Sequence, residues 1–178
     1  SLQSGCDATL KRMNRHYDTD SFSKTCEVLR EFFKDPAITT DVIVGFPGES
    51  ESEFEQTKHF LERISFSKMH IFKYSRRKGT IADKMPGQID ESEKSNRSDE
   101  LHRLDQKLEH DYLERFIGKR EKVLFEEKIE KDGRTFWTGL NERYARICVE
   151  TGKDLENKIE EVEITGFLDP ETLLGVYL

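Results

Sequence analysis

The sequence has few cysteines, and none of them is in a metal-binding pattern. Its three cysteines, Cys6, Cys26 and Cys148, are far apart, and no C-x-x-C pair occurs. An odd number of widely spaced cysteines is typical of free thiols in a reducing compartment, which predicts a cytoplasmic protein without structural disulfides. The residues of this chain therefore provide no cysteine motif for zinc or for an iron–sulfur cluster.

Long apolar runs are also absent. Hydrophobic residues make up 34% of the 178 residues and charged residues 37%. No apolar stretch approaches the length of about 20 residues that a membrane helix needs, and no signal peptide is visible, so we expect no membrane partner. The chain opens with Ser1 rather than with Met, at what reads as the end of a strand. We therefore expect it to be a piece of a longer protein.

Positive charge is in short supply. The formal net charge is −7, which argues mildly against nucleic-acid binding by the whole surface, because phosphate contacts need clustered Lys and Arg. A local basic face remains possible. Twelve Phe indicate packed cores rather than disorder.

One stretch, residues 37–49, organises the first half of the chain. β-branched residues dominate positions 38–44, as in a parallel strand that is covered on both faces. Gly45 and Gly48 flank Pro47, so the strand ends there and leaves backbone that a ligand could approach. In α/β folds, ligands bind at this carboxyl end of a strand.

Helices are expected on both sides of this strand. The pattern predicts a short helix over 8–15 and an amphipathic helix over 22–33 that is capped near Thr19 or Asp20. Ser50 and Glu53 have the spacing of a capping box for a third helix. The first helix contains a basic group of three residues, Lys11, Arg12 and Arg15. This group is either a solvated helix end or a contact for a carboxylate or phosphate.

A second strand is predicted over residues 67–74, and a basic loop follows it. His70 inside the strand reads as a structural residue. The loop carries three adjacent cations, Arg76, Arg77 and Lys78, before Gly79. It is either a solvated loop or a place where a charged substrate arrives. Strand, helix and strand in this order predict parallel βαβ units, which make up only part of a barrel.

The second half of the chain changes from helical to alternating periodicity. Apolar residues at helical spacing predict a long helix that ends at Gly118. Five short strands follow, with a hairpin signal at Asp132-Gly133, and they suggest a small antiparallel barrel. Alternation predicts that only one of Phe136 and Trp137 faces inward. Such barrels bind RNA through exposed aromatic and cationic residues, for which the candidates here are Arg134, Trp137, Arg143, Tyr144 and Arg146.

Four motifs in this order resemble a known family. They are the segments 3–7, 13–15, 40–49 and 74–80, and they are similar to the radical S-adenosylmethionine methylthiotransferases that modify tRNA. The strands after residue 118 resemble the TRAM domain of that family. The resemblance implies an α/β fold: the C-terminal part of a radical SAM partial TIM-type barrel over residues 1–114, then the TRAM-like barrel over 115–178.

The resemblance also implies an activity. Enzymes of this family use S-adenosylmethionine and two 4Fe–4S clusters to methylthiolate C2 of an adenosine next to the tRNA anticodon. Residues 70–72 look more like the enzymes that act on N6-threonylcarbamoyladenosine than those that act on isopentenyladenosine. The cluster ligands of the family are absent from this chain, so it is expected to be inactive alone and to hold no metal or catalytic residue of its own.

The resemblance also implies which residues of this sequence would form the family's cofactor pocket. Val44, Gly45 and Phe46 would contact the adenine, and the strand end at Phe72 and Tyr74 would add backbone contacts. Polar groups for the ribose and the methionine carboxylate would come from Gln3, Ser4 and Arg15. Arg76, Arg77 and Lys78 would contact tRNA phosphate or the carboxylate of the modified base.

Three alternatives remain open at this stage. The chain could act on isopentenyladenosine, it could be a non-catalytic RNA-binding module, or Gly45–Gly48 could be the phosphate turn of a TIM-type half-barrel. A half-barrel also exposes a strand edge, through which two copies could form a dimer. The electron donor is not identified by any residue.

Overall fold

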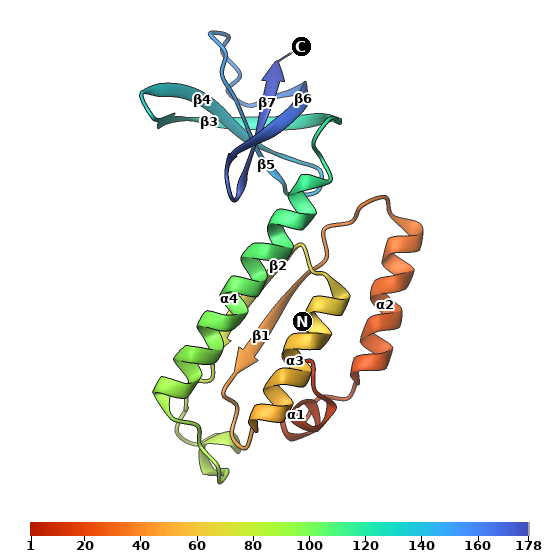
Figure 1. Cartoon of the computed structure of the whole chain (residues 1–178), viewed down its shortest axis with the longest axis vertical. Coiled ribbons are helices and arrows are strands. Elements are labelled where there is room, and N and C mark those ends of the chain that lie inside the picture. Colours follow the sequence, from red (N-terminus) through yellow and green to blue (C-terminus); the bar gives the residue numbers. More distant parts are fainter. Residues whose placement is uncertain (178) are drawn as a thin grey trace. The chain divides into compact units, whose positions relative to one another are not determined.

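The computed structural model describes residues 1–177, which divide into two compact units between Leu108 and Glu109 (Figure 1). Helix α4 (Glu91–Glu114) runs across this division. The domain boundary expected at residues 114 and 115 lies at the C-terminal end of the same helix. Each unit has its own sheet, as the change of periodicity predicts.

The first unit is built from parallel β/α units. Strands β1 (Thr39–Val44) and β2 (Lys68–Lys73) pair in parallel, and a single parallel bridge joins Gln3 to Val42 on the other side of β1. In place of the strand expected before Gly5, the described residues therefore form only this single bridge. The helices of the unit are α1 (Asp7–Arg12), α2 (Thr19–Phe32), α3 (Glu51–Ile64) and the first part of α4, with a short 3₁₀ helix at Ala82–Lys84.

Local sequence signals predict the helix ends correctly in one case and approximately in two others. Ser50 and Glu53 form the predicted capping box of α3: the Ser50 hydroxyl accepts from the Glu53 N–H at 3.3 Å, and the Glu53 carboxylate accepts from the Ser50 N–H at 2.8 Å. The cap of α2 is Asp18, one residue before the predicted position. Helix α1 ends at Arg12 rather than at Arg15, and Asn14 follows with a left-handed φ of 58°.

Only one face of the parallel sheet is well covered in this chain. Thr40, Val42 and Val44 are buried beneath helices, whereas Ile43 on the opposite face is only partly buried and its neighbour on β2, Phe72, is 54% exposed. The prediction that β1 is covered on both faces is therefore wrong for the described residues. The uncovered face is available to a ligand or to a further part of the protein.

Two further expectations for the first unit are corrected. His70 is exposed on the uncovered face, so it is not a buried structural histidine. Cys26 on α2 is buried as expected, but Phe33 at the end of the predicted apolar face is 60% exposed, and Phe32 beside it is 78% exposed. A dimer through the exposed strand edge of the half-barrel stays a prediction.

The second unit is a closed five-stranded barrel. In barrel order its strands are β3 (Arg120–Lys131), β4 (Arg134–Asn141), β5 (Arg146–Val149), β7 (Thr172–Tyr177) and β6 (Lys158–Asp169). The pair β5–β7 is parallel and the other pairs are antiparallel. Asp132 and Gly133 both have positive φ, as the predicted hairpin turn requires.

The alternation expected for Phe136 and Trp137 does not appear as a difference in exposure. Phe136 is 1% exposed and Trp137 is 4% exposed, so both are buried. The Lys153 carbonyl in the loop before β6 accepts the Trp137 indole N–H at 2.8 Å. Burial at both positions therefore does not separate the inward ring from the outward one.

Candidate functional site

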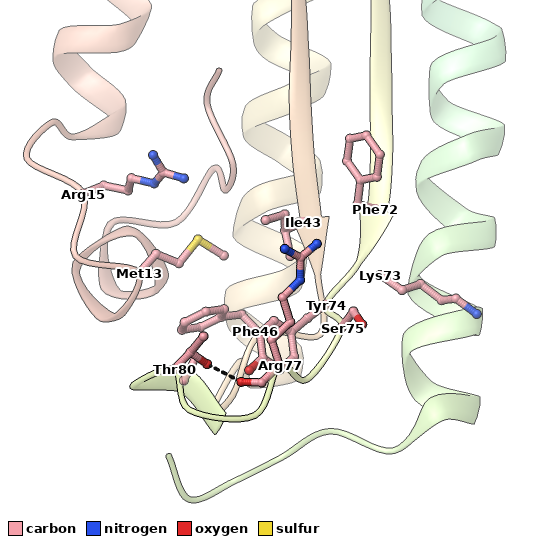
Figure 2. Close-up of a pocket in the computed structure, with 11 residues that line it drawn as sticks. Met13, Arg15, Ile43, Phe46, Phe72, Lys73, Tyr74, Ser75, Arg77 and Thr80 are labelled. Carbon is pink, nitrogen blue, oxygen red and sulfur yellow. Dashed lines mark hydrogen bonds between the residues drawn. The ribbon is translucent and has the colours of Figure 1, made fainter. Parts of the chain in front are cut away.

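A pocket opens at the carboxyl ends of β1 and β2, within the first unit (Figure 2). Its volume is about 470 Å³, which is in the range of small-molecule sites. Its walls come from the segment after α1, from β1, from the end of β2 and from the loop that follows. The lining residues are Met13, Arg15, Ile43, Phe46, Phe72, Lys73, Tyr74, Ser75, Arg77, Thr80 and Ala82.

One side of the pocket is apolar and aromatic. The rings of Phe46 and Tyr74 meet edge to face, with centroids 5.3 Å apart and an interplanar angle of 73°. Met13 and the exposed ring of Phe72 lie on other walls (Figure 2). Among residues 1–177 the Tyr74 hydroxyl has no hydrogen-bond partner although it is buried. Aromatic walls suit a flat heterocyclic ligand.

The other feature of the pocket is positive charge. Arg15, Lys73 and Arg77 line it, and no acidic residue does. Lys73 donates to the Ser95 hydroxyl at 3.2 Å. Within the described chain neither Arg15 nor Arg77 forms an ion pair, and Figure 2 shows both guanidinium groups extending toward the cavity. The pocket can therefore receive an anionic group.

The glycine turn after β1 is closed by its own hydrogen bonds. The Gly45 N–H donates to the Glu49 carboxylate at 2.7 Å, the Gly48 N–H donates to the Gly87 carbonyl at 2.8 Å, and the Glu49 N–H donates to the Phe46 carbonyl at 3.0 Å. A phosphate has little access to these three donors, and the Glu49 carboxylate would repel it. The turn is therefore not a phosphate site, and the alternative built on Gly45–Gly48 is overturned.

Helix α4 covers the backbone of this turn. A Cβ atom at Gly45 would lie 2.3 Å from Cγ of Lys94, whose side chain is buried. Gly45 has a φ of +72°, which favours glycine, but its backbone is not the bare surface that the sequence suggested. The requirement for glycine here comes from packing against α4.

A buried ion pair holds the turn to α4. Glu49 is 2% exposed and Arg97 is 5% exposed, and their side chains meet at 2.8 Å. Burial raises the pKa of the Glu49 carboxyl, although the Gly45 N–H and Arg97 favour its charged form. Arg97 also contacts Glu51 and Glu93, so it ties α4 to the start of α3. The sequence contained no clear signal for this pair, because its members are 48 positions apart.

The loop after β2 is organised around Asp83. Arg76 donates to the Asp83 carboxylate at 2.7 Å, and the Gly79 N–H donates to the same carboxylate at 3.1 Å. The Thr80 hydroxyl donates to the Arg77 carbonyl at 2.8 Å and accepts from the Asp83 N–H at 3.2 Å. The loop backbone is thus fixed, while the side chain of Arg77 is left at the pocket.

Comparisons with known proteins now bear on this pocket. The family description "Radical SAM superfamily" matches residues 1–61. The chain is 41% identical over 146 residues to the threonylcarbamoyladenosine tRNA methylthiotransferase MtaB of Thermotoga maritima, a match that covers 82% of this chain and 33% of that protein. It is 33% identical over 174 residues to the tRNA-2-methylthio-N(6)-dimethylallyladenosine synthase of Protochlamydia amoebophila, covering 98% of this chain and 38% of that protein.

A third relative has a different printed substrate. The ribosomal protein uS12 methylthiotransferase RimO of Thermotoga petrophila is 40% identical over 139 residues, which cover 77% of this chain and 32% of that protein. Over most of its length the chain is similar to radical SAM methylthiotransferases. It spans about one third of the length of these curated relatives. The mixed α/β first unit and the small barrel agree with the fold expected for a part of such a protein.

The methylthiotransferase resemblance named eight cofactor residues, and the structure brings only some of them to the pocket. Arg15, Phe46, Phe72 and Tyr74 line it. The other four lie behind it: Ser4 is fully buried and bonded to the Thr57 hydroxyl at 3.1 Å, and Gln3, Val44 and Gly45 are buried as well. Sequence reasoning missed Met13, Ile43, Lys73, Ser75, Thr80 and Ala82. For Ile43, the alternation along β1 could have shown that it faces away from Val42 and Val44.

The RNA-binding candidates in the barrel also divide into two groups. Arg134 is paired with Glu150, Arg143 donates to Glu121 at 2.6 Å, and Trp137 is buried. These three are engaged within the fold, so they do not form an open face. Tyr144 is 81% exposed in the turn before β5, and Arg146 is exposed at the start of that strand.

No group that could hold a metal ion is present among residues 1–177. Cys6, Cys26 and Cys148 are separate buried thiols, and burial raises the pKa of the last two. The side chains of this part of the chain do not fit an iron–sulfur cluster, whose thiolate ligands must lie together. No helix of the described chain is long and apolar enough to span a membrane.

Proposed function

We propose that this chain is part of a radical SAM enzyme that methylthiolates C2 of N6-threonylcarbamoyladenosine beside the tRNA anticodon. The observation that carries the proposal is the pocket at the ends of β1 and β2. It combines an aromatic wall with two unpaired arginines within residues 1–177, in a chain that is similar to the methylthiotransferases. A pocket of this kind suits an adenosine that bears a carboxylate.

S-adenosylmethionine has groups that are complementary to the walls of this pocket. Phe46 and Tyr74 offer the adenine an apolar aromatic surface. Arg15 is placed to bind the methionine carboxylate. When bound to an iron–sulfur cluster, S-adenosylmethionine supplies the radical that starts the reaction. The residues of this chain bind and orient the cofactor, and a cluster would have to be held elsewhere in the enzyme.

The choice of N6-threonylcarbamoyladenosine rests on the charge of the pocket. Sequence identity does not make this choice, because relatives with that printed substrate are 41% and 35% identical to this chain and a dimethylallyladenosine enzyme is 38% identical. Three cations and no acidic residue line the pocket beside its apolar walls. The isopentenyl substituent is a hydrocarbon and gains nothing from a guanidinium, whereas a threonylcarbamoyl group carries a carboxylate.

For the tRNA itself, the second unit offers a small contact surface. Tyr144 is exposed for stacking on a base, and Arg146 is exposed for a phosphate contact. Lys78 on the loop after β2 is a further candidate for phosphate. A non-catalytic RNA-binding module is the second candidate function, because the closed barrel with Tyr144 and Arg146 could act without the pocket.

A chimeric enzyme tests the proposed function. Residues 1–178 would replace the aligned segment of the T. maritima relative, and tRNA modified in vitro would be digested and analysed by mass spectrometry. We expect the 2-methylthio product of N6-threonylcarbamoyladenosine. A product only on isopentenyladenosine, or only on ribosomal protein uS12, would show another substrate class. A folded chimera that binds tRNA but makes none of these products would favour the RNA-binding module.

The isolated chain provides a complementary test. We expect S-adenosylhomocysteine, an unreactive analogue of the cofactor, to bind to it in calorimetry, and we expect no turnover of tRNA. Arg15→Ala should weaken this binding about tenfold through the loss of one charge-assisted hydrogen bond, while Lys11→Ala on α1 serves as the matched control.

A further inference from the structure

We infer that Arg77 is the residue that recognises the carboxylate of the substrate's N6 substituent, and that it sets the preference for an anionic over a hydrocarbon substituent. The inference rests on the proposed function, since it assigns the second of the two arginines at the same pocket. It goes beyond that function because it separates one residue from a run of three cations that look alike in the sequence.

The three adjacent cations have different surroundings. Arg76 is bound to Asp83 through both its carboxylate and its carbonyl oxygen, each at 2.7 Å. Lys78 is exposed but does not line the pocket. Arg77 lines the pocket, and its guanidinium has no ion-pair partner among the residues that the structure describes (Figure 2). Only Arg77 therefore combines an available charge with access to the cavity.

Hydrogen bonds within the loop fix the backbone at Arg77. Thr80 donates to its carbonyl at 2.8 Å, and Asp83 joins Arg76, the Gly79 N–H and Thr80 in one hydrogen-bonded unit. These contacts use the backbone of Arg77 and leave its side chain out. A cation whose backbone is fixed loses less conformational entropy when it binds an anion, so this loop is pre-organised for recognition.

Charge balance also calls for a second anion. S-adenosylmethionine carries one carboxylate, and Arg15, which also lines the pocket, is available for it. No acidic residue lines the pocket to neutralise Arg77. A threonylcarbamoyl substituent would supply the missing carboxylate. A dimethylallyl substituent would instead have to remove water from the guanidinium without replacing its hydrogen bonds, which is a penalty against that substrate.

The test measures binding of three nucleosides to the full chain saturated with S-adenosylhomocysteine. The probes are N6-threonylcarbamoyladenosine, N6-dimethylallyladenosine and adenosine, and NMR titration gives each dissociation constant. We expect the first to bind about tenfold more tightly than adenosine, as one charge-assisted hydrogen bond allows, and the second to bind no more tightly than adenosine.

Variants then assign the effect to one residue. Arg77→Ala should bring N6-threonylcarbamoyladenosine to the affinity of adenosine while S-adenosylhomocysteine binds within twofold of its original affinity. Arg77→Lys should keep part of the preference, and Lys78→Ala, the matched neighbour, should keep all of it. Equal thermal midpoints would show that the loop variants are folded, as expected for exposed positions.

The outcomes separate the two proposals. If the chain binds S-adenosylhomocysteine but shows no preference for the carboxylate-bearing nucleoside, or if Arg77→Ala keeps that preference, the assignment of Arg77 is wrong and the cofactor pocket stands. If S-adenosylhomocysteine does not bind the unaltered chain at all, the proposed function and the inference both fail.

Discussion

The two turns that follow the parallel strands differ in what their polar groups do. After β1, the N–H groups of Gly45, Gly48 and Glu49 are all bonded within the protein, and Lys94 covers Gly45. After β2, the loop satisfies its backbone through Asp83 but leaves the side chain of Arg77 at the pocket. The first turn is a structural anchor and the second is a recognition loop. A glycine-rich turn at a strand end is thus not a ligand site by that fact alone.

The largest effect should come from breaking the anchor of the first turn. Arg97→Ala leaves the Glu49 carboxylate buried without its cation, which should lower the free energy of unfolding by about 3–5 kcal/mol. Because burial already raises the pKa of Glu49, the deficit should be smaller in acid, where Glu49 can take up a proton, than at neutral pH. Urea denaturation at two pH values measures both effects.

The second loop provides the control for that experiment. Arg76→Ala removes a bridge to Asp83 in which the Arg76 side chain is 61% exposed, so it should cost less than about 1 kcal/mol. Equal losses for Arg97→Ala and Arg76→Ala would contradict the distinction between anchor and recognition loop.

Two glycines with positive φ make the comparison sharper. An alanine at Gly45 would be strained at φ +72° and would collide with Lys94, whereas an alanine at Gly79 would be strained at φ +91° but would meet no atom within 4 Å. We expect Gly45→Ala to cost about 2–3 kcal/mol and Gly79→Ala about 1 kcal/mol. Thermal denaturation checks the order, and a reversed order would show that crowding by α4 is not the reason for Gly45.

A third pair of variants tests how strongly α4 stabilises β2, the strand before the recognition loop. The Met69 N–H of β2 donates to Asp105 of α4 at 2.7 Å, and Asp105 is 4% exposed. Asp105→Ala leaves a buried N–H unpaired and should cost about 2 kcal/mol, whereas Asp105→Asn keeps an acceptor and should cost less.

The same position predicts a pH effect. Burial raises the pKa of Asp105 in the folded state, so its contribution to stability is greatest below its ordinary pKa and is lost as the pH rises through the folded value. The original protein should therefore lose stability relative to Asp105→Asn as the pH rises above about 4, the ordinary pKa of an aspartate. A constant difference as the pH rises would show that Asp105 titrates normally.

Local signals account for the part of the fold that the sequence predicted. The capping box at Ser50 and Glu53, the Asp132-Gly133 turn and the change from helical to alternating periodicity each act over a few residues, and each is confirmed. The packing of Lys94 on Gly45 and the hydrogen bond from Trp137 to the loop before β6 depend on segments distant in sequence, so no local pattern could indicate them.

The candidate site shows the same division. The family resemblance named Phe46, Phe72 and Tyr74, which lie at or just after strand ends, and all three line the pocket. Which of the three neighbouring cations faces that pocket could not be predicted, because the answer depends on Asp83 capturing Arg76. In the barrel, likewise, composition alone could not tell that Arg134 and Arg143 have acidic partners while Tyr144 is exposed.

The smallest effect is expected in the barrel, where engaged and exposed residues can again be compared. Tyr144→Ala and Arg146→Ala should each weaken binding of a tRNA anticodon stem-loop to the full chain by about 1 kcal/mol, and Arg134→Ala should not, because Glu150 already occupies that guanidinium. Fluorescence anisotropy at two salt concentrations measures this, and the Arg146 variant should also show a weaker salt dependence. A larger loss for Arg134→Ala than for Tyr144→Ala would place the RNA on a different face.

The most direct test of the account is an NMR titration of the isotope-labelled chain with S-adenosylhomocysteine. We predict saturable shifts of the signals of Met13, Phe46, Tyr74 and Arg77, and none in residues 120–177. Shifts confined to the barrel would contradict the assignment of this pocket to the cofactor. The absence of a saturable shift at concentrations up to about 10 mM would contradict it as well, because this limit corresponds to the weakest binding energy that the pocket should provide.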